Sequence, residues 1–141
     1  MELEVSSDPT LLDRQMIGEF LRQSPWAKGI PQSRVDTAIN NSLCFGGYLG
    51  AQQVAFARVI SDFATYAYLG DVFVVEAHRG KGYSKRLLEA IQHHPELLGL
   101  RRFSLHSSSA RGLYASFGFL PSEKPETYME IMNPTVYLDS A

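Results

Sequence analysis

The sequence of 141 residues has little cysteine, little excess charge and no long apolar run, and each shortage excludes a class of protein. The single cysteine, Cys44, cannot form an internal disulfide, and its neighbours Leu43 and Phe45 favour a small core residue over a nucleophile. Charged residues make up 20% of the chain and the net charge is −2, so nothing favours a nucleic-acid or anionic-membrane partner. No apolar run approaches the length of a membrane span, so no membrane partner is expected.

Other absences narrow the expectation further. The first residues, Met1 to Glu4, lack the basic and apolar parts of a signal peptide, which favours a cytoplasmic protein. No pair of histidines and carboxylates has metal-ligand spacing, so no metal is expected. The length suits one domain over residues 1–141 with a single buried core.

The pattern of apolar residues predicts helices first, then strands, then an alternation of the two. Helices are expected from residue 9 to about 24 and from 31 to 39, and again over 83–94 and 109–117. Strands are expected over 43–49, 53–61, 65–76, 102–106, 119–120 and 127–132. This order indicates an α+β domain: a mixed, mostly antiparallel central sheet flanked by helices.

The most informative stretch joins a strand to a helix through a basic, glycine-containing turn. The apolar run 72–75 is followed by the turn 79–84, and the helix then begins. A helix N-terminus exposes backbone N–H groups and carries a partial positive charge. Gly80 and Gly82 allow an anion to approach the backbone closely, and Arg79 and Lys81 add positive charge. The turn therefore predicts a phosphate site, with an ordinary strand-to-helix loop as the alternative.

Two motifs in the expected order give the chain a family resemblance. Arg79, Gly82 and Ser84 stand at the defined positions of the acetyl-CoA-binding motif Arg/Gln-x-x-Gly-x-Gly/Ala, with serine replacing the last glycine or alanine. Residues 110–119, Ala-Arg-Gly-Leu-Tyr-Ala-Ser-Phe-Gly-Phe, fit the pattern A-x-x-L-Y-x-x-x-G-F. From Leu43 onward the chain therefore resembles the GNAT (Gcn5-related) N-acetyltransferases.

The resemblance implies acetyl-CoA as a cosubstrate and direct transfer of its acetyl group to a primary amine. It places the pyrophosphate on the 79–84 turn and the cofactor arm along the central strand, in a gap between that strand and the strand at 103–105. The implied cofactor-binding residues are Phe73, Val74, Val75, Arg79, Gly80, Lys81, Gly82, Tyr83 and Ser84. Ser107 stands where the family often has an asparagine, which is a departure in this region.

The resemblance also implies catalytic roles. Tyr114 matches the family's general acid, which protonates the leaving CoA thiolate, although its helical stripe also suits a core aromatic residue. Asp71 is the candidate general base because it shares a strand face with Phe73 and Val75, with a turn aspartate as the alternative. His106 is a further candidate base at the end of the next strand.

The acceptor is the least determined part of the expectation. Trp26, Tyr48 and Asp62 are predicted walls of the acceptor pocket, although each could serve only in packing or a turn. Carboxylates near the site favour a cationic amine, and a small-molecule amine is the expected partner. A protein amine, a catalytically inactive acyl-CoA-binding regulatory domain and a nucleotide-binding module are the alternatives. A homodimer is left open.

Overall fold

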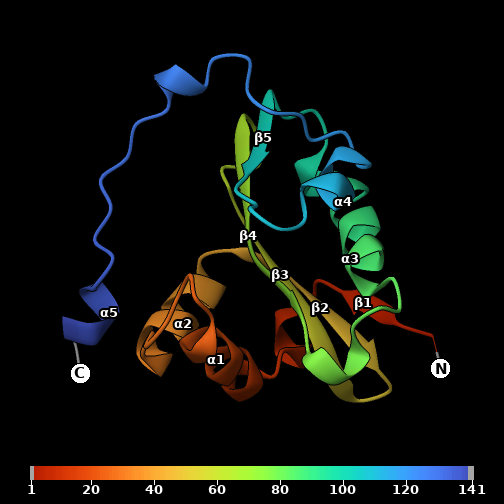
Figure 1. The fold of residues 1–141 in the computed structure, drawn as a ribbon. Coiled ribbons are helices and arrows are strands. Elements are labelled where there is room, and N and C mark those ends of the chain that lie inside the picture. The colour runs from red at the N-terminus through yellow and green to blue at the C-terminus, as the bar shows by residue number, and fades with distance from the viewer. Residues whose placement is uncertain (1, 140–141) are drawn as a thin grey trace.

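The computed structural model describes residues 2–139, which form an open five-stranded sheet with helices on both faces (Figure 1). The strands follow the chain in the order β1-β2-β3-β4-β5; the first four are antiparallel and β5 runs parallel to β4. Their bounds are β1 Glu4–Ser6, β2 Leu43–Leu49, β3 Gln52–Ser61, β4 Tyr66–Val74 and β5 Arg102–Leu105. The predicted mixed, mostly antiparallel sheet is confirmed.

The helices divide between the two faces of the sheet. The α-helices are α1 Arg14–Gln23, α2 Gln32–Asn40, α3 Tyr83–Gln92, α4 Arg111–Ala115 and α5 Val136–Asp139. The 3-10 turns are η1 Pro9–Leu11, η2 Glu76–His78, η3 Pro95–Leu97 and η4 Pro125–Thr127. One core cluster joins α3 to the sheet and a second joins α1 and α2 to the opposite face. No helix among residues 2–139 is long and apolar enough to cross a membrane.

The prediction of a continuous first helix was wrong, because two aspartates each begin a separate turn of helix. The Asp8 carboxylate accepts a hydrogen bond from the Thr10 N–H at 2.9 Å and starts η1. Leu12 is then extended, and the Asp13 carboxylate accepts from the Met16 N–H at 3.0 Å and starts α1. Each side chain satisfies a backbone donor that a helix N-terminus leaves free.

Predictions at the two ends of the chain were also wrong. Neither 119–120 nor 127–132 forms a strand, because no described strand pairs with either segment. Conversely, β1 was missed, because three residues are too few to show an alternating pattern and their pairing depends on distant β2, where Val5 lies opposite Gly47. The middle strands were predicted closely, and β2 has the predicted bounds.

The feature of the sheet that creates a site is the parting of β4 from β5. The two strands pair only from Tyr66–Arg102 to Leu69–Leu105, after which β4 continues to Val74 paired with β3 but not with β5. Past that point β4 also carries a bulge, because Asp71 and Val72 lie opposite the single residue Ala57 of β3. Bulges bend a strand and redirect its side chains. The gap predicted beside the central strand therefore exists.

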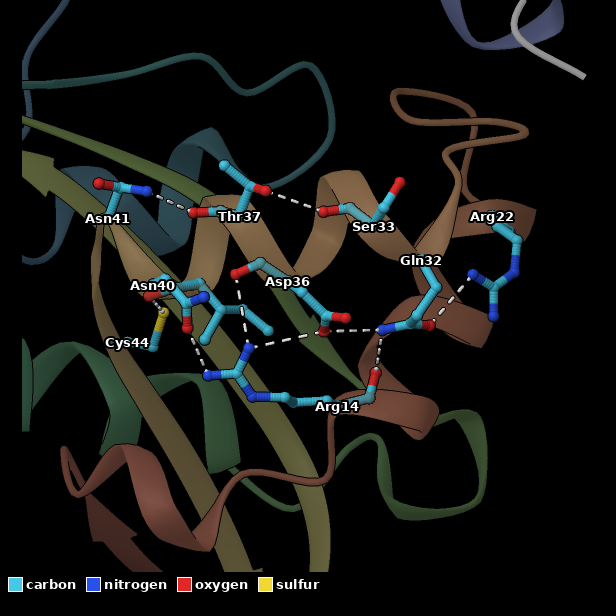
Figure 2. A network of polar contacts seen from close by, with 10 residues as sticks. Arg14, Arg22, Gln32, Ser33, Asp36, Thr37, Asn40, Asn41 and Cys44 are labelled. Carbon is cyan, nitrogen blue, oxygen red and sulfur yellow. Dashed lines mark hydrogen bonds and ion pairs between the residues drawn. The ribbon is translucent and has the colours of Figure 1, made fainter.

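A polar network holds α1 and α2 together and so positions the loop between them (Figure 2). The Gln32 side-chain amide donates to the Arg14 carbonyl at 3.1 Å and to the Asp36 carboxylate at 3.2 Å. Its oxygen accepts from Arg22 Nη1 at 3.2 Å, and Arg14 Nη2 donates to Asn40 Oδ1 at 2.7 Å. Gln32 thus bonds to both helices at once.

Gln32→Ala should destabilise the fold by about 1–2 kcal/mol, because it removes partly buried hydrogen bonds that join α1 to α2. Urea denaturation followed by circular dichroism measures the change. Gln15→Ala is the matched control, because Gln15 is exposed and bonds only to Glu19 one turn along the same helix. Equal stability of the two variants would contradict a bridging role for Gln32.

Candidate active site

A cleft of about 590 Å³ opens where β4 has parted from β5. One wall is the free end of β4, a second is α4, a third is the end of α1 with the loop that follows, and the start of α3 closes it. The lining residues are Phe20, Gln23, Ser24, Pro25, Trp26, Val72, Phe73, Val74, Glu76, Arg79, Ser84, Ala110, Leu113 and Tyr114. The fold therefore brings the predicted strand, turn and tyrosine into one cavity.

Near its free end, the backbone of β4 directs the N–H of one residue, Val74, toward this cleft. The Val75 N–H donates to the Val54 carbonyl at 2.9 Å, so residue 75 faces β3 and cannot serve a ligand in the gap. Peptide groups alternate in direction along a strand, so Phe73 faces β3 as well and Val74 faces the gap. The prediction that all three residues offer backbone groups is corrected: Val74 offers its N–H, its carbonyl accepts from Arg79, and Phe73 contributes its side chain.

The turn before α3 exposes its backbone, and the space beside its two glycines is open. Gly80 and Gly82 have φ values of 80° and 79°, in the left-handed region that favours glycine. A Cβ added at either position would meet no heavy atom within 4 Å. Gly82 is the N-cap of α3 and supplies no side chain to the first N–H groups of the helix. Because no side chain caps them, these N–H groups could receive an anion.

The two basic residues of the turn have separate surroundings. Arg79 Nε donates to the Val74 carbonyl at 2.9 Å, which ties the turn to the free end of β4. Lys81 is exposed, and its Nζ lies 3.4 Å from His78 Nδ1. Ser84 lines the cleft in the first turn of α3, so serine at this motif position faces the cavity. Arg79 therefore shapes the turn as well as supplying charge.

Tyr114 both packs in the core and lines the cleft, so the two roles considered for it are compatible. Its ring meets the edge of the Phe119 ring at a centroid distance of 6.1 Å. Gly118, at φ 93°, lets the chain turn back so that the Phe119 N–H donates to the Tyr114 carbonyl at 3.1 Å. Burial raises the pKa of the Tyr114 hydroxyl, so the group keeps its proton at neutral pH.

Asp71 lies beside the cleft and not in its lining. Its carboxylate accepts from Arg58 Nε at 2.8 Å and from the Trp26 indole N–H at 2.9 Å. It has a φ of 51° at the bulge and lines a second cavity, of about 240 Å³, between α1, α2 and the sheet. Asp71 therefore lies on the α1–α2 face of the sheet, as Phe73 and Val75 do, but the expectation that it reaches the cleft is corrected, because its carboxylate is held by Arg58 and Trp26 beside the second cavity.

Two predicted acceptor residues lie elsewhere. Tyr48 is 7% exposed, lines neither cavity and folds back over Gly46; burial, with Asp8 and Asp13 nearby, raises its pKa to about 12. At the β3–β4 hairpin, Asp62 accepts hydrogen bonds from the Thr65 hydroxyl at 2.6 Å and from the backbone N–H groups of residues 64–66, and these bonds lower its pKa well below the usual range. Both fit the packing or turn role considered as the alternative. Only Trp26 of the three lines the cleft.

An aromatic wall at the cleft was not predicted as a unit. The rings of Phe20 and Phe73 stack with centroids 3.8 Å apart, and Trp26 lies 6.4 Å from Phe20. Phe20 was assigned to the apolar stripe of a helix, which gives no signal that separates a core residue from a cleft residue. Arg58 was likewise missed as the partner of Asp71, because the two lie on different strands.

Other predicted polar residues have structural contacts. The Ser107 hydroxyl accepts from the Ala110 N–H at 3.0 Å at the start of α4. The His106 Nδ1 lies 3.1 Å from the Tyr68 hydroxyl, on the sheet face opposite α3. Cys44 is buried, and burial raises its pKa to about 11, which agrees with a core residue. Among residues 2–139 no three histidine, cysteine, aspartate or glutamate residues cluster as metal ligands.

Comparison with known proteins shows which family the chain belongs to. Residues 40–121, more than half of the chain, match the family model described as acetyltransferase (GNAT) domain. The Gibberella zeae protein FG08082, named as an acetyltransferase, is 31% identical over 117 residues, and the match covers 66% of this chain and 66% of that protein. The chain thus spans about two thirds of the length of that relative.

Solved structures agree with this match. A crystal structure assigned to the GNAT family, from Xanthomonas campestris pv. campestris, has 55% identity and a TM-score of 0.94, covering 97% of both chains. An acetyltransferase-type structure from Clostridium acetobutylicum, which holds acetyl-CoA, has 14% identity and a TM-score of 0.68, covering 93% of this chain and 96% of that one. The second comparison shows a shared fold. By its sequence and its fold, this chain belongs to the GNAT family of acetyltransferases.

Proposed function

We propose that the protein transfers an acetyl group from acetyl-CoA directly to a primary amine of a small molecule. The observation that carries the proposal is the single cleft that joins the open N-terminus of α3, the free edge of β4 and the hydroxyl-bearing Tyr114. The pyrophosphate of acetyl-CoA needs the helix N-terminus, the amides of its arm need the free strand edge, and its thioester end needs a nearby proton donor. Acetyl-CoA would supply the activated acetyl group when bound.

The residues of the turn suit the phosphate end of this cosubstrate. The space beside Gly80 and Gly82 admits phosphate oxygens to the first N–H groups of α3, where the helix dipole favours negative charge. Lys81 adds an exposed positive charge. The peptide edge of Val74 can pair with an amide of the arm as a neighbouring strand would. This chain therefore holds the ligand with backbone groups at both ends of the turn.

Tyr114 acts as the general acid. Its hydroxyl gives its proton to the thiolate that leaves as the neutral amine attacks the carbonyl, and the resulting phenolate takes up, through solvent, the proton that the new amide nitrogen loses. A phenol whose pKa is raised by burial is protonated throughout the neutral range, so it is ready to donate. Asp71 has a positioning role instead: it holds the Trp26 indole, and Arg58 balances its charge.

The aromatic wall faces the acceptor. Trp26 is 52% exposed at the rim of the cleft, and the stacked rings of Phe20 and Phe73 lie behind it. Glu76, which is exposed, also lines the cleft. Aromatic faces attract cations, and a carboxylate does the same. These groups favour a cationic amine with an apolar body.

A thiol-release assay with acetyl-CoA tests the proposal across a panel of small primary amines and a lysine-containing peptide. We expect turnover with small amines, highest for those with an apolar or aromatic body. Binding of acetyl-CoA by calorimetry without turnover on any acceptor would instead identify a regulatory domain. Turnover on the peptide alone would identify a protein amine as the acceptor.

Tyr114→Phe should lower kcat by about 10²–10⁴-fold, the range of general acid catalysis, while the calorimetric affinity for CoA stays within about twofold. The variant keeps the ring that packs on Phe119 and loses only the hydroxyl. Tyr48→Phe is the matched control, because it removes a buried tyrosine hydroxyl outside the cleft and should leave kcat unchanged. Unchanged kcat in Tyr114→Phe would refute the assignment.

Gly82→Glu should weaken CoA binding by at least about tenfold, the loss of one charge-assisted hydrogen bond, because a carboxylate would enter the phosphate space. Gly99→Glu is the control, since Gly99 has a φ of 77° and open space beside it but lies outside the cleft. It imposes similar backbone strain and should bind CoA normally in the same titration. Equal weakening in both would show that strain, not the site, is responsible.

A further inference from the structure

The second cavity, between α1, α2 and the sheet, is not used by the proposed acetyl transfer. Its volume is about 240 Å³, whereas protein cores hold few spaces larger than one water molecule. An apolar cavity of about 150 Å³ is large enough to hold benzene. The second cavity therefore has room for an aromatic ring, or a branched alkyl chain, together with a short polar group.

The second cavity is apolar inside and polar where it meets solvent. Its inner walls are buried side chains of α1, α2 and β3, among them Ile17, Leu21, Val35, Ile39 and Phe56. Arg34 and Thr37, which also line the cavity, are exposed, so it reaches solvent along α2. Tyr137 of α5, the helix beside α2 in Figure 1, completes the lining. A ligand would therefore meet an apolar interior behind a polar mouth.

The charged groups of the cavity leave one positive charge without a partner. The Asp71 carboxylate accepts from Arg58 Nε at 2.8 Å and from the Trp26 indole N–H at 2.9 Å, so both of its oxygens are engaged and Arg58 balances its charge. Arg34 belongs to no salt bridge within residues 2–139. Opposite charges attract, so the mouth of the cavity favours an anion over a cation.

Arg58 offers a further donor to an anion. Its Nε bonds to Asp71, and its Nη1 donates to the Ser42 hydroxyl at 3.2 Å. Its Nη2 has no hydrogen-bond partner among residues 2–139, and it is not sealed from solvent, because the Tyr48 hydroxyl is the one fully buried polar side-chain atom of that range without a partner. Guanidinium groups form strong, charge-assisted hydrogen bonds with carboxylates.

We propose that the second cavity binds a small organic carboxylate. The apolar body of this ligand, an aromatic ring or a branched chain, fills the interior, and its carboxylate pairs with Arg34 at the mouth. The proposal follows from the volume, the apolar walls and the uncompensated charge of Arg34. It concerns a site other than the acetyl-transfer cleft and does not rest on the proposed function.

Trp26 connects the second cavity to the cleft and can report on its occupancy. It is the one tryptophan of the chain, it lines the cleft, and it donates to Asp71, which lines the second cavity. Beside this pair, the Phe73 ring in the cleft lies 5.7 Å from the Phe56 ring in the second cavity. One layer of side chains separates the two sites. An anion that enters the second cavity should therefore change the fluorescence of Trp26.

Two sources of such a carboxylate, the acidic end of an acceptor amine and a separate small molecule, differ in their kinetics. In the thiol-release assay, saturating 3-phenylpropanoate should raise the KM for the amine at constant kcat if the cavity holds the acidic end of the acceptor. It should change kcat if the cavity holds a separate regulator. This comparison depends on the proposed function, whereas the two binding tests that follow do not.

Titration with 3-phenylpropanoate, followed by calorimetry and by Trp26 fluorescence, tests the site. We expect saturable binding by both methods, and binding at least about tenfold weaker for the uncharged 3-phenylpropanamide. Arg34→Gln should raise the Kd for the carboxylate about tenfold, the loss of one charge-assisted hydrogen bond. Arg101→Gln is the matched control, because Arg101 is exposed and lies outside the cavity. No binding at millimolar concentration, or equal affinity in wild type and Arg34→Gln, would overturn the proposal.

A variant that fills the cavity tests the place of the apolar body. Ala38 lines the second cavity and is half-buried, so Ala38→Phe should occupy its space and abolish binding of 3-phenylpropanoate. Ala38→Ser keeps the space and should bind as the wild type does. Cooperative urea unfolding, followed by circular dichroism, checks that both variants are folded. Unchanged affinity in a folded Ala38→Phe variant would overturn the proposal.

Discussion

The parting of β4 from β5 is the constraint on which the rest of the site depends. Parallel pairing ends at Leu69 and Leu105, and the remainder of β4 has a backbone edge that no strand of the described chain occupies. Unpaired peptide groups in a folded protein need another partner. Here the Val74 carbonyl bonds to Arg79, and its N–H faces a cleft rimmed by Tyr114.

Local sequence signals predicted the parts of this site whose geometry is decided within a few residues. Gly80 and Gly82 adopt left-handed backbone conformations that few other residues tolerate, so the turn could be recognised from its letters. Gly118 does the same beside Tyr114. Strands β2 and β3 were found because apolar runs and a short turn are also local. The family resemblance rests on these same segments.

Contacts between distant segments could not be predicted in the same way. The partners of Asp71 are Arg58, on another strand, and Trp26, in a loop 45 residues away, and no periodic pattern connects them. The segment 127–132 shows the converse error. It has the composition of a strand, but a strand needs a neighbouring strand, and no strand of the described chain pairs with it.

The bond from Arg79 to the Val74 carbonyl has a mechanical meaning. It couples the turn before α3 to the free end of β4, so a displacement of one is transmitted to the other. A ligand that reduces the motion of the turn therefore also reduces the motion of the strand, and thermal motion of the strand also displaces the turn. If the proposed function holds, affinity for the nucleotide end of acetyl-CoA and alignment of its acetyl end depend on each other through this bond.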